Sequence, residues 1–209
     1  MSPTAVRRTQ GDRRARTRAA LLTAAAQGLS TYGYASLVLE DVARDAGYTR
    51  GALYHQFPGK ADLALAVVQW VRETWEVEVL QPALAEADPL TSLLTMARGH
   101  TIYCRRNAAA RVMLTLRVEF AGQDHPVGRA IAEILSQLEA ECATLISRAR
   151  RNGSIPSGPP ARLTALAYTG VLEAVAIEVA GRAPHDVRLM DGAVRGLLGV
   201  APARTPRAR

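Results

Sequence analysis

The segment of residues 37–60 is the feature that most constrains how this 209-residue chain can fold. Its first part places apolar residues at three- and four-residue spacing, which predicts a short helix with one buried face. Gly47 follows, where a left-handed cap conformation costs glycine little, and Thr49 can then cap a second helix with its hydroxyl. Two short helices joined by such a tight turn form a helix-turn-helix, whose second helix enters the major groove of DNA. The segment therefore predicts a DNA-binding domain.

Small or polar side chains dominate the second helix of this motif, and these let a helix approach base edges closely. We predict that Leu53 and Tyr54 point back toward the core and that Phe57 is a core residue just beyond the helix. The side chains that can reach phosphates or bases are Arg50, His55 and Lys60.

Over about residues 17–68 the chain resembles the DNA-binding domain of the TetR family of bacterial repressors. The resemblance begins with a predicted first helix over residues 17–32. It continues through Glu40-Asp41-Val42-Ala43, Ala46-Gly47, Gly51-Ala52-Leu53-Tyr54-His55 and Phe57-Pro58-Gly59-Lys60. The DNA contacts that this resemblance implies are Thr49, Arg50, Gly51, Ala52, Tyr54, His55 and Lys60, with Leu39 and Tyr48 at neighbouring positions that also face DNA in some members.

Two positions depart from the family pattern. Val38 stands where the family usually has Ser or Thr at the start of the second helix, so a side-chain cap is in question there unless Ser36 supplies it. Gln56 replaces a frequent aromatic residue or histidine, which alters a phosphate contact and leaves the fold intact.

Basic residues concentrate at the end of the chain that carries the motif. Residues 1–60 carry a net charge of +5, residues 61–203 a net charge of −1, and residues 204–209 add +3. Such basic segments bind DNA because they neutralise phosphates and release counterions. Five arginines lie within the first 16 residues and no apolar run accompanies them, so we predict a basic flexible arm there and no signal peptide.

Beyond residue 60 the sequence shows helical periodicity without strand-like alternation or an internal repeat. Pro82 is predicted to end the first helix of this region, and glycine- and proline-rich runs mark loops at 122–126 and 152–160. The predicted helices cover residues 61–80, 89–106, 108–121, 127–151, 161–181 and 186–199.

The helix predicted over residues 161–181 is apolar on nearly every side. One face of such a helix packs on its own bundle, and a partner chain is the simplest cover for another, although the centre of a monomeric bundle is an alternative. The family resemblance implies that the last two helices of each chain form a four-helix homodimer interface. Two-fold symmetry then matches a palindromic operator in double-stranded DNA.

The resemblance also implies a small-molecule pocket in the C-terminal bundle, where an inducer shifts the population toward a dimer geometry that no longer fits DNA. Arg117 and Glu173 are notable because each interrupts an apolar run and a buried charge needs a partner, which each residue could also find in the other. The candidate lining residues are Trp70, Met96, His100, Tyr103, Met113, Arg117, Phe120, Tyr168 and Glu173.

The sequence offers little for catalysis, because it contains no phosphate-binding glycine loop, nucleophile elbow, H-E-x-x-H or C-x-x-C motif. His100 and Cys104 lie one helical turn apart, but two ligands alone make a poor metal site. Cys104 and Cys142 are expected as reduced thiols. We therefore predict no enzyme, catalytic residue, metal or cofactor; a small helical enzyme is one alternative, and a constitutive DNA-binding dimer without a ligand is another.

Together these features predict an all-α chain of about nine helices, with an N-terminal three-helix helix-turn-helix domain joined to a C-terminal helical dimerisation and ligand-binding bundle. The predicted parts are a flexible arm (1–16), the helix-turn-helix domain (17–60), the ligand-binding and dimerisation domain (61–200) and a basic flexible tail (201–209). The predicted function is a cytoplasmic, ligand-responsive transcriptional repressor. It binds its operator as a homodimer, is released by a small-molecule inducer and does not enter a membrane.

Overall fold

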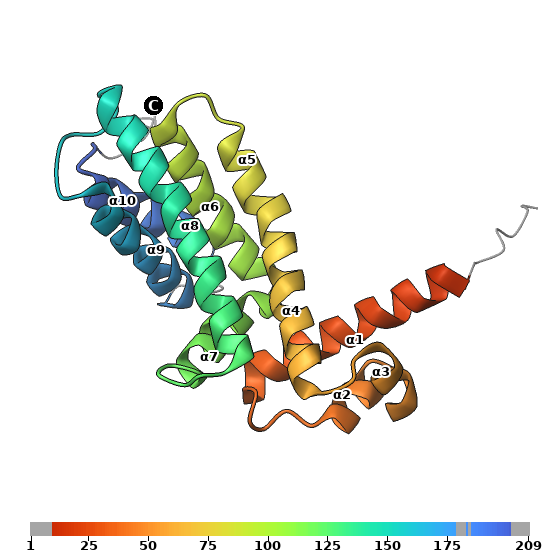
Figure 1. The fold of residues 1–209 in the computed structure, drawn as a ribbon. Helices are drawn as coiled ribbons and strands as arrows, with labels where there is room; N and C mark the ends of the chain where they lie inside the picture. The colour runs from red at the N-terminus through yellow and green to blue at the C-terminus, as the bar shows by residue number, and fades with distance from the viewer. Residues whose placement is uncertain (1–9, 179–182, 184, 202–209) are drawn as a thin grey trace, which may run out of the picture.

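The computed structural model describes residues 10–178, 183 and 185–201, and within these residues all regular secondary structure is helical (Figure 1). The predicted all-α fold is confirmed. The helices are α1 (Gln10–Tyr32), α2 (Leu39–Asp45), α3 (Arg50–Gln56), α4 (Lys60–Trp75), α5 (Gln81–Leu84), α6 (Pro89–Arg106), α7 (Arg111–Glu119), α8 (Pro126–Arg151), α9 (Ala161–Glu178) and α10 (His185–Leu198). A π-helical segment (Glu76–Leu80) joins α4 to α5, and a short 3₁₀ helix (Ala108–Ala110) precedes α7.

The first three helices form the predicted helix-turn-helix. Gly47 takes the left-handed conformation with φ +76°, which lets the chain turn sharply after α2. Thr49 caps α3, since its hydroxyl accepts a hydrogen bond from the backbone N–H of Ala52 at 3.2 Å. Leu53 and Phe57 are buried and fix α3 against the core. Both turn signals in the sequence therefore act as predicted.

The ends of two helices differ from the prediction. α1 begins at Gln10, seven residues before the expected start at Thr17, so the part of the expected flexible arm from residue 10 onward is helical and exposed. Residues 1–9 of that arm and residues 202–209 of the tail lie outside the described residues. At the start of α2, Val38 has no side-chain cap, and Glu40 and Asp41 in the first turn compensate by facing the positive end of the helix dipole.

Pro82 does not end the helix that begins at Lys60, contrary to prediction. A π-helical turn shifts the hydrogen-bond register before it, and the N–H of Gln81 bonds to the carbonyl of Glu76. Pro82 then falls in the first turn of α5, where its missing N–H leaves no bond unmade. Helical residues consequently run without a break from Lys60 to Leu84. If α4, the π-helical segment and α5 are counted as one continuous helix, the described residues contain nine helices, in agreement with the prediction of about nine.

Two hydrophobic cores hold the helices together. The first contains α1–α3 together with the beginning of α4, one face of α7 and the beginning of α8. The second lies among α6, α8, α9 and α10, with buried Met96, Cys142 and Tyr168 near its centre. The boundary predicted after Lys60 separates the chain by sequence, but the first core continues across it. The DNA-binding motif is therefore packed directly on helices of the C-terminal bundle.

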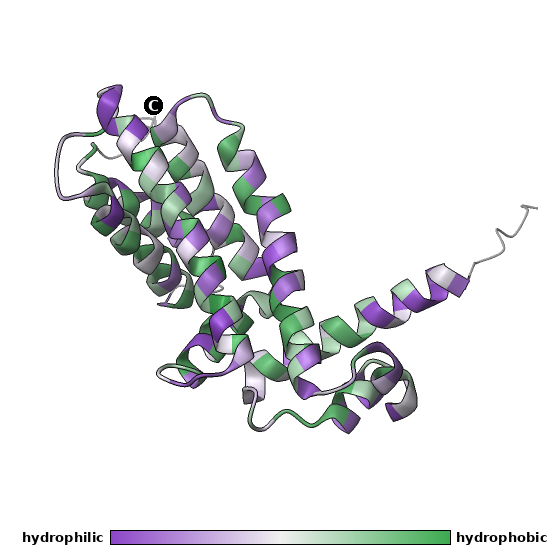
Figure 2. Ribbon diagram, in the orientation of Figure 1, coloured by the Kyte–Doolittle hydropathy of each residue, from purple (hydrophilic) through white to green (hydrophobic). Residues whose placement is uncertain are grey.

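Figure 1 shows α1–α3 at one end of the molecule and the bundle of α5, α6 and α8–α10 at the other, with α4 running between them. Hydrophobic residues make up much of α9 in Figure 2. Among the described residues, no helix has the length and apolar character needed to cross a membrane.

Candidate DNA interface and ligand cavity

One face of α3 is turned to solvent and carries most of the predicted DNA contacts. Arg50, Gly51, Tyr54 and His55 are exposed there, while Leu53 on the opposite face is fully buried. The prediction that Tyr54 points into the core is wrong, since 38% of its surface is exposed beside the predicted contacts. The small and polar residues thus form one outward surface that a DNA groove can approach.

The remaining predicted contacts have mixed surroundings. Tyr48 and Thr49 are exposed in the turn and Ala52 is half-buried. Leu39 is buried in the first core, so it stabilises the motif and does not face DNA in this conformation. Its place at the start of α2, where the chain folds back on α1, explains why a position that faces DNA in some members is core here.

Arg50 is held at the edge of this surface by neighbours within the motif. Its guanidinium forms an exposed ion pair with Glu40 at 2.9 Å, and it lies over the Tyr54 ring at 5.2 Å from the centroid. Exposed pairs of this kind contribute little to stability. The pair orients Arg50 along the outward face of α3, and Glu40 can release it when a phosphate approaches.

Lys60, predicted to bind a phosphate, is bonded within the protein. Its ammonium donates to the carbonyl of Ala35 at 2.8 Å and lies 4.9 Å from the ring centroid of Tyr34. Lys60 therefore fastens the loop between α1 and α2 to the start of α4. An ammonium has three donors, so a phosphate contact remains compatible with this bond.

The same loop is held from the other side by Glu119, the last residue of α7. Its two carboxylate oxygens accept hydrogen bonds from the backbone N–H groups of Tyr34 at 2.6 Å and Ala35 at 2.7 Å. Hydrogen bonds to an ionised acceptor are shorter and stronger than neutral ones. We call this contact the Glu119 clamp. It joins the DNA-binding motif to the bundle across 84 and 85 residues of sequence.

Aromatic rings reinforce the clamp. The Tyr34 ring meets Phe120 and His125 edge-on at 5.2 and 5.0 Å between centroids, and Phe120 and His125 stack on each other at 4.1 Å. Phe120, a predicted ligand contact, is therefore part of the joint between α1 and α7.

A cavity of about 730 Å³ lies inside the bundle, which is within the usual range for small-molecule sites. Most of its lining surface is apolar, although about half of the lining residues are polar or charged. The lining residues are Val71, Arg72, Trp75, Glu76, Leu80, His100, Tyr103, Cys104, Arg105, Arg106, Ala110, Arg111, Met113, Leu114, Thr115, Ile134, Leu135, Gln137, Leu138, Glu141, Thr169, Leu172, Glu173, Ala176 and Ile177. They come from α4, α6, α7, α8 and α9 and the segments that join them.

Four of the nine predicted ligand residues line this cavity, namely His100, Tyr103, Met113 and Glu173. Five do not. Trp70 and Phe120 pack with the first core, and Met96 lies in the second core with its sulfur 3.9 Å from the thiol of Cys142. Tyr168 is fully buried and donates its hydroxyl to the carbonyl of Leu93 at 2.6 Å. Arg117 pairs with Glu173.

The Arg117–Glu173 pair links α7 to α9 beside the cavity, with 2.6 Å between the guanidinium nitrogen and the carboxylate oxygen. The two charges that interrupt apolar runs in the sequence thus compensate each other. Arg105 is compensated likewise, by the buried carboxylate of Asp186 at the start of α10, at 3.3 Å.

Trp75, His100 and Cys104 form the main uncharged polar group of the cavity. The indole N–H of Trp75 donates to Nδ1 of His100 at 3.0 Å, and Nε2 of His100 lies 3.5 Å from the sulfur of Cys104. Burial lowers the pKa of His100 to about 4, so its ring is neutral at neutral pH. Burial raises the pKa of the Cys104 thiol to about 12, which keeps it protonated and a poor nucleophile.

Metal and disulfide chemistry find little support in the part of the chain that the structure describes. No group of three or more His, Cys, Asp or Glu side chains there could hold a metal ion. Cys104 and Cys142 are both free thiols, as expected.

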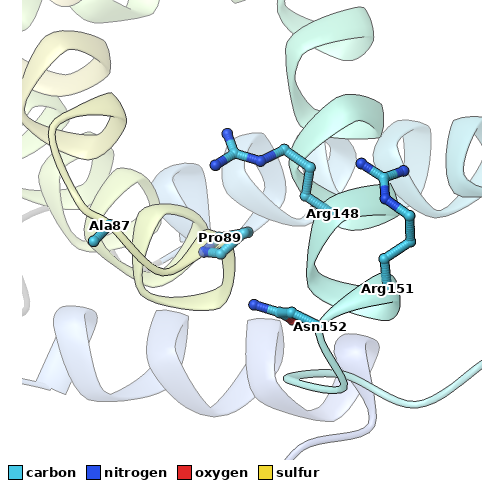
Figure 3. A pocket seen from close by; sticks show the side chains of 5 residues that line it. All are labelled: Ala87, Pro89, Arg148, Arg151 and Asn152. Carbon is cyan, nitrogen blue, oxygen red and sulfur yellow. The ribbon is translucent and has the colours of Figure 1, made fainter.

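A second, shallower depression of about 340 Å³ lies between the start of α6 and the end of α8 (Figure 3). Its sides are formed by Ala87, Pro89, Arg148, Arg151 and Asn152. Both arginines are exposed, and the depression lacks the enclosing apolar wall of the larger cavity.

Comparison with known proteins shows which family the chain resembles. The family model of "Bacterial regulatory proteins, tetR family" matches residues 21–67, the helix-turn-helix with the start of α4. The A-factor receptor protein of Streptomyces griseus is 32% identical over 121 residues, which are 57% of this chain but 42% of that relative, so the chain spans less than half of its length. The transcriptional repressor BepR of Brucella suis is 30% identical over 156 residues, covering 73% of this chain and 74% of the relative.

The chain belongs to the TetR family. The solved structure of AibR in complex with isovaleryl coenzyme A and operator DNA has the same fold, with a TM-score of 0.75 and 21% identity over 89% of this chain and 100% of AibR. The family model covers the helix-turn-helix, and the likeness to AibR extends the same fold over the helical bundle of this TetR-family protein.

Several cavity residues had no clear signal in the sequence. Trp75 has the spacing of a core residue, and Cys104 was weighed as a possible metal ligand. The arginines at positions 72, 105, 106 and 111 resemble ordinary solvated charges in a helical pattern. Trp75 lies on α4 and His100 on α6, and their contact cannot be predicted from the helical periodicity of either helix alone.

Acidification is expected to destabilise this TetR-family protein through His100. Because burial lowers its pKa from 6.5 to about 4, the unfolded chain binds a proton between those pH values that the folded chain does not bind. Stability is therefore lost as the pH falls, by about 2 to 3 kcal/mol between pH 7 and pH 4.5 at roughly 1.4 kcal/mol per pKa unit. Urea unfolding of the unaltered protein and of His100→Gln at both pH values measures this difference. An equal loss of stability in the two proteins would contradict the assignment to His100.

Proposed function

We propose that this protein is a homodimeric, ligand-responsive transcriptional repressor, which binds a palindromic operator and is released from it by a small-molecule inducer. The observation that carries the proposal is the arrangement of α7, which lines the cavity at one end and holds the DNA-binding motif through the Glu119 clamp at the other. As a bacterial DNA-binding regulator it acts in the cytoplasm, where the operator lies.

Operator binding is supported by the outward face of α3 and by charge. Arg50 and His55 extend from exposed positions on α3, and small residues beside them allow close approach to base edges. Arg13, Arg14 and Arg16 lie on the exposed N-terminal part of α1. These charges can neutralise phosphates that flank the contacted bases.

Dimerisation through the last two helices is supported by their exposed faces. On α9, Leu163, Leu166 and Ile177 are about half-exposed, with exposed Gly170 between them. α10 carries exposed Leu189 followed at helical spacing by two exposed glycines, Gly192 and Gly196.

These glycines argue for a close partner. A Cβ added at Gly170, Gly192 or Gly196 would meet no described atom within 4 Å, so packing within the chain does not require them. Glycine in a helix interior costs about 1 kcal/mol relative to alanine. If two helix backbones pack closely across a two-fold axis, glycine is needed there, and the contact offsets its cost in helix stability. The apolar side chains around the glycines supply the buried area of this contact.

Ligand response is supported by the cavity and its position. α7 contributes Met113, Leu114 and Thr115 to the lining, and Glu119 lies one turn further along the same helix. A ligand that displaces α7 therefore moves the loop held by the clamp, and with it α2 and α3. The cavity favours this function over a constitutive DNA-binding dimer. AibR, of the same fold, was solved with both an acyl coenzyme A and operator DNA, which fits a site of this kind.

In vitro selection from random duplex DNA tests the proposal. We expect an enriched palindrome, because the two α3 helices of a symmetric dimer read equivalent half-sites. Tyr54→Ala is expected to weaken binding to that sequence by about 1 to 3 kcal/mol. Tyr32→Ala is the matched control, since Tyr32 is 68% exposed at the end of α1, away from α3. Equal effects of the two substitutions, or no enriched sequence at low salt, would refute the assignment of α3 as the reading helix.

A further inference from the structure

The hydrogen bond between Trp75 and His100 fixes which nitrogen of the histidine carries its proton. An indole N–H can only donate, so Nδ1 of His100, 3.0 Å away, must accept and carries no proton. The neutral ring then has its single proton on Nε2. His100 therefore presents a permanent, uncharged N–H donor in the wall of the cavity.

Among the described residues this donor meets no strong acceptor. The atom recorded beside Nε2 is the sulfur of Cys104 at 3.5 Å, and a thiol sulfur is a weak acceptor. Nε2 cannot take up the thiol proton because it already carries the proton of the neutral ring, and the lone pair of Nδ1 is occupied by the indole N–H of Trp75. The pair is thus unsuited to nucleophilic chemistry, and the Nε2–H group in the cavity wall has only a weak acceptor.

Several of the other polar groups around the cavity are engaged within the protein. The hydroxyl of Tyr103 lies 2.8 Å from that of Thr74, and the hydroxyl of Thr169 donates to the carbonyl of Leu166. The charges of Glu173 and Arg105 are compensated by Arg117 and Asp186. The charged and amide side chains at positions 72, 76, 106, 111, 137 and 141 also line the cavity and have no hydrogen-bond or ion-pair partner among the described residues. Most of the remaining wall is hydrocarbon. A ligand that complements this cavity is apolar over most of its surface and places one acceptor at His100.

We propose that the inducer of this protein is a largely apolar molecule that carries an oxygen acceptor, a carbonyl or carboxylate, and that Nε2–H of His100 donates a hydrogen bond to this oxygen. The inference rests on the proposed ligand-responsive function, which it deepens by naming the class of ligand. A hydrocarbon of equal shape would leave the Nε2–H of His100 without an acceptor. An ammonium group would place a second donor against it, which is unfavourable.

Trp75 supplies the signal for a direct test. Trp70→Phe leaves Trp75 as the single tryptophan of the chain, in the cavity wall. Four pyrene derivatives that bear an ethyl, acetyl, carboxylate or aminomethyl group share one apolar body and quench tryptophan emission when they bind close by. We expect acetylpyrene or pyrene carboxylate to bind about tenfold more tightly than ethylpyrene, and aminomethylpyrene to bind no better than ethylpyrene. Whichever of acetylpyrene and pyrene carboxylate binds more tightly shows whether the preferred oxygen is neutral or anionic.

Substitution of His100 assigns the preference. In the same background, His100→Phe is expected to abolish the preference for acetylpyrene over ethylpyrene, and His100→Gln, which keeps a donor, is expected to retain part of it. Equal affinities of the ethyl and oxygen-bearing probes in the Trp70→Phe protein would overturn the proposal. A preference that survives in folded His100→Phe, tightest binding of the amine, or no quenching by any probe would also overturn it.

Nitrogen-15 NMR of the unaltered full-length protein provides a measurement that does not depend on the variants folding. We expect the proton of His100 on Nε2 and a downfield shift of that proton when acetylpyrene is added. A proton on Nδ1 would overturn the proposal. The two hypotheses fail separately, because these probes need no DNA: a protein that shows the oxygen preference but selects no operator refutes the proposed function alone, whereas one that selects an operator without this preference refutes the ligand class alone.

Discussion

Replacing Glu119 by alanine is expected to lower the free energy of unfolding by about 2 to 3 kcal/mol and to weaken operator binding about tenfold. The substitution removes two short hydrogen bonds from a carboxylate to the backbone of Tyr34 and Ala35, and bonds to charged groups contribute about 1.5 to 3 kcal/mol each. Part of this loss is recovered, because the exposed N–H of Ala35 can bond to water.

Operator binding weakens because the clamp sets the position of the DNA-binding motif on the bundle. Without it, the loop loses its bond to α7 and keeps the bond from Lys60, the aromatic contacts of Tyr34 and the burial of Leu37, so α2 and α3 occupy a wider range of positions. The wider range costs affinity for the best operator, and it relaxes discrimination between half-site spacings.

The decisive readout is therefore the affinity for operators whose half-sites are moved apart or together by one or two base pairs. Glu119→Ala is expected to bind the altered spacings almost as well as the selected spacing, while the unaltered protein prefers the selected one. Glu119→Gln, which keeps one acceptor oxygen, is expected to lie between them. Glu133→Ala, on the exposed surface of α8, removes a carboxylate outside the clamp and serves as the charge-matched control. A loss of stability in Glu119→Ala with unchanged spacing preference would mean that Glu119 stabilises the fold without positioning the motif.

The sequence predicted the DNA-binding motif well because that motif depends on local chemistry. Gly47 and Thr49 act on their immediate neighbours, and the spacing of apolar residues in α2 and α3 shows which face is buried. Leu39 and Tyr54 were exceptions. Leu39 is buried where a DNA contact was predicted, and the Tyr54 ring is exposed because an aromatic side chain on a short helix fits a core position and an exposed one equally well.

The clamp and the cavity could not be predicted in the same way because they depend on contacts between distant segments. Glu119 resembles any charged residue at the end of a helix until Tyr34 is brought next to it by the packing of α1 on α7. Among the predicted ligand residues, Met96 and Tyr168 are of the same residue types as Met113 and Tyr103, yet only Met113 and Tyr103 line the cavity. The helical periodicity of apolar residues identifies which face of a helix is buried. Whether that face lines a cavity depends on how far apart the neighbouring helices lie, which the sequence does not show.

Gly192→Leu is expected to raise the dissociation constant of the homodimer at least about thirtyfold while the single chain stays folded. Within the chain the substitution has space, because no described atom lies within 4 Å of a Cβ at this position, and leucine is a better helix former than glycine. Across a close helix pair the added side chain has no space, and overpacking costs about 1 to 3 kcal/mol. Two-fold symmetry places the substitution in the interface twice, which doubles the cost, and each 1.4 kcal/mol is about tenfold in affinity.

Sedimentation velocity over a range of protein concentrations measures the dissociation constant, and far-UV circular dichroism with urea unfolding shows whether the chain is folded. Ala132→Leu, on an exposed position of α8, adds similar bulk outside α9 and α10 and is expected to leave the dimer intact. At concentrations where Gly192→Leu is monomeric, binding to a full palindrome is expected to fall to that of a single half-site, because one α3 helix then acts alone. A Gly192→Leu dimer as tight as that of the unaltered protein would place the dimer interface elsewhere, and the exposed glycines of α9 and α10 would then need another cause.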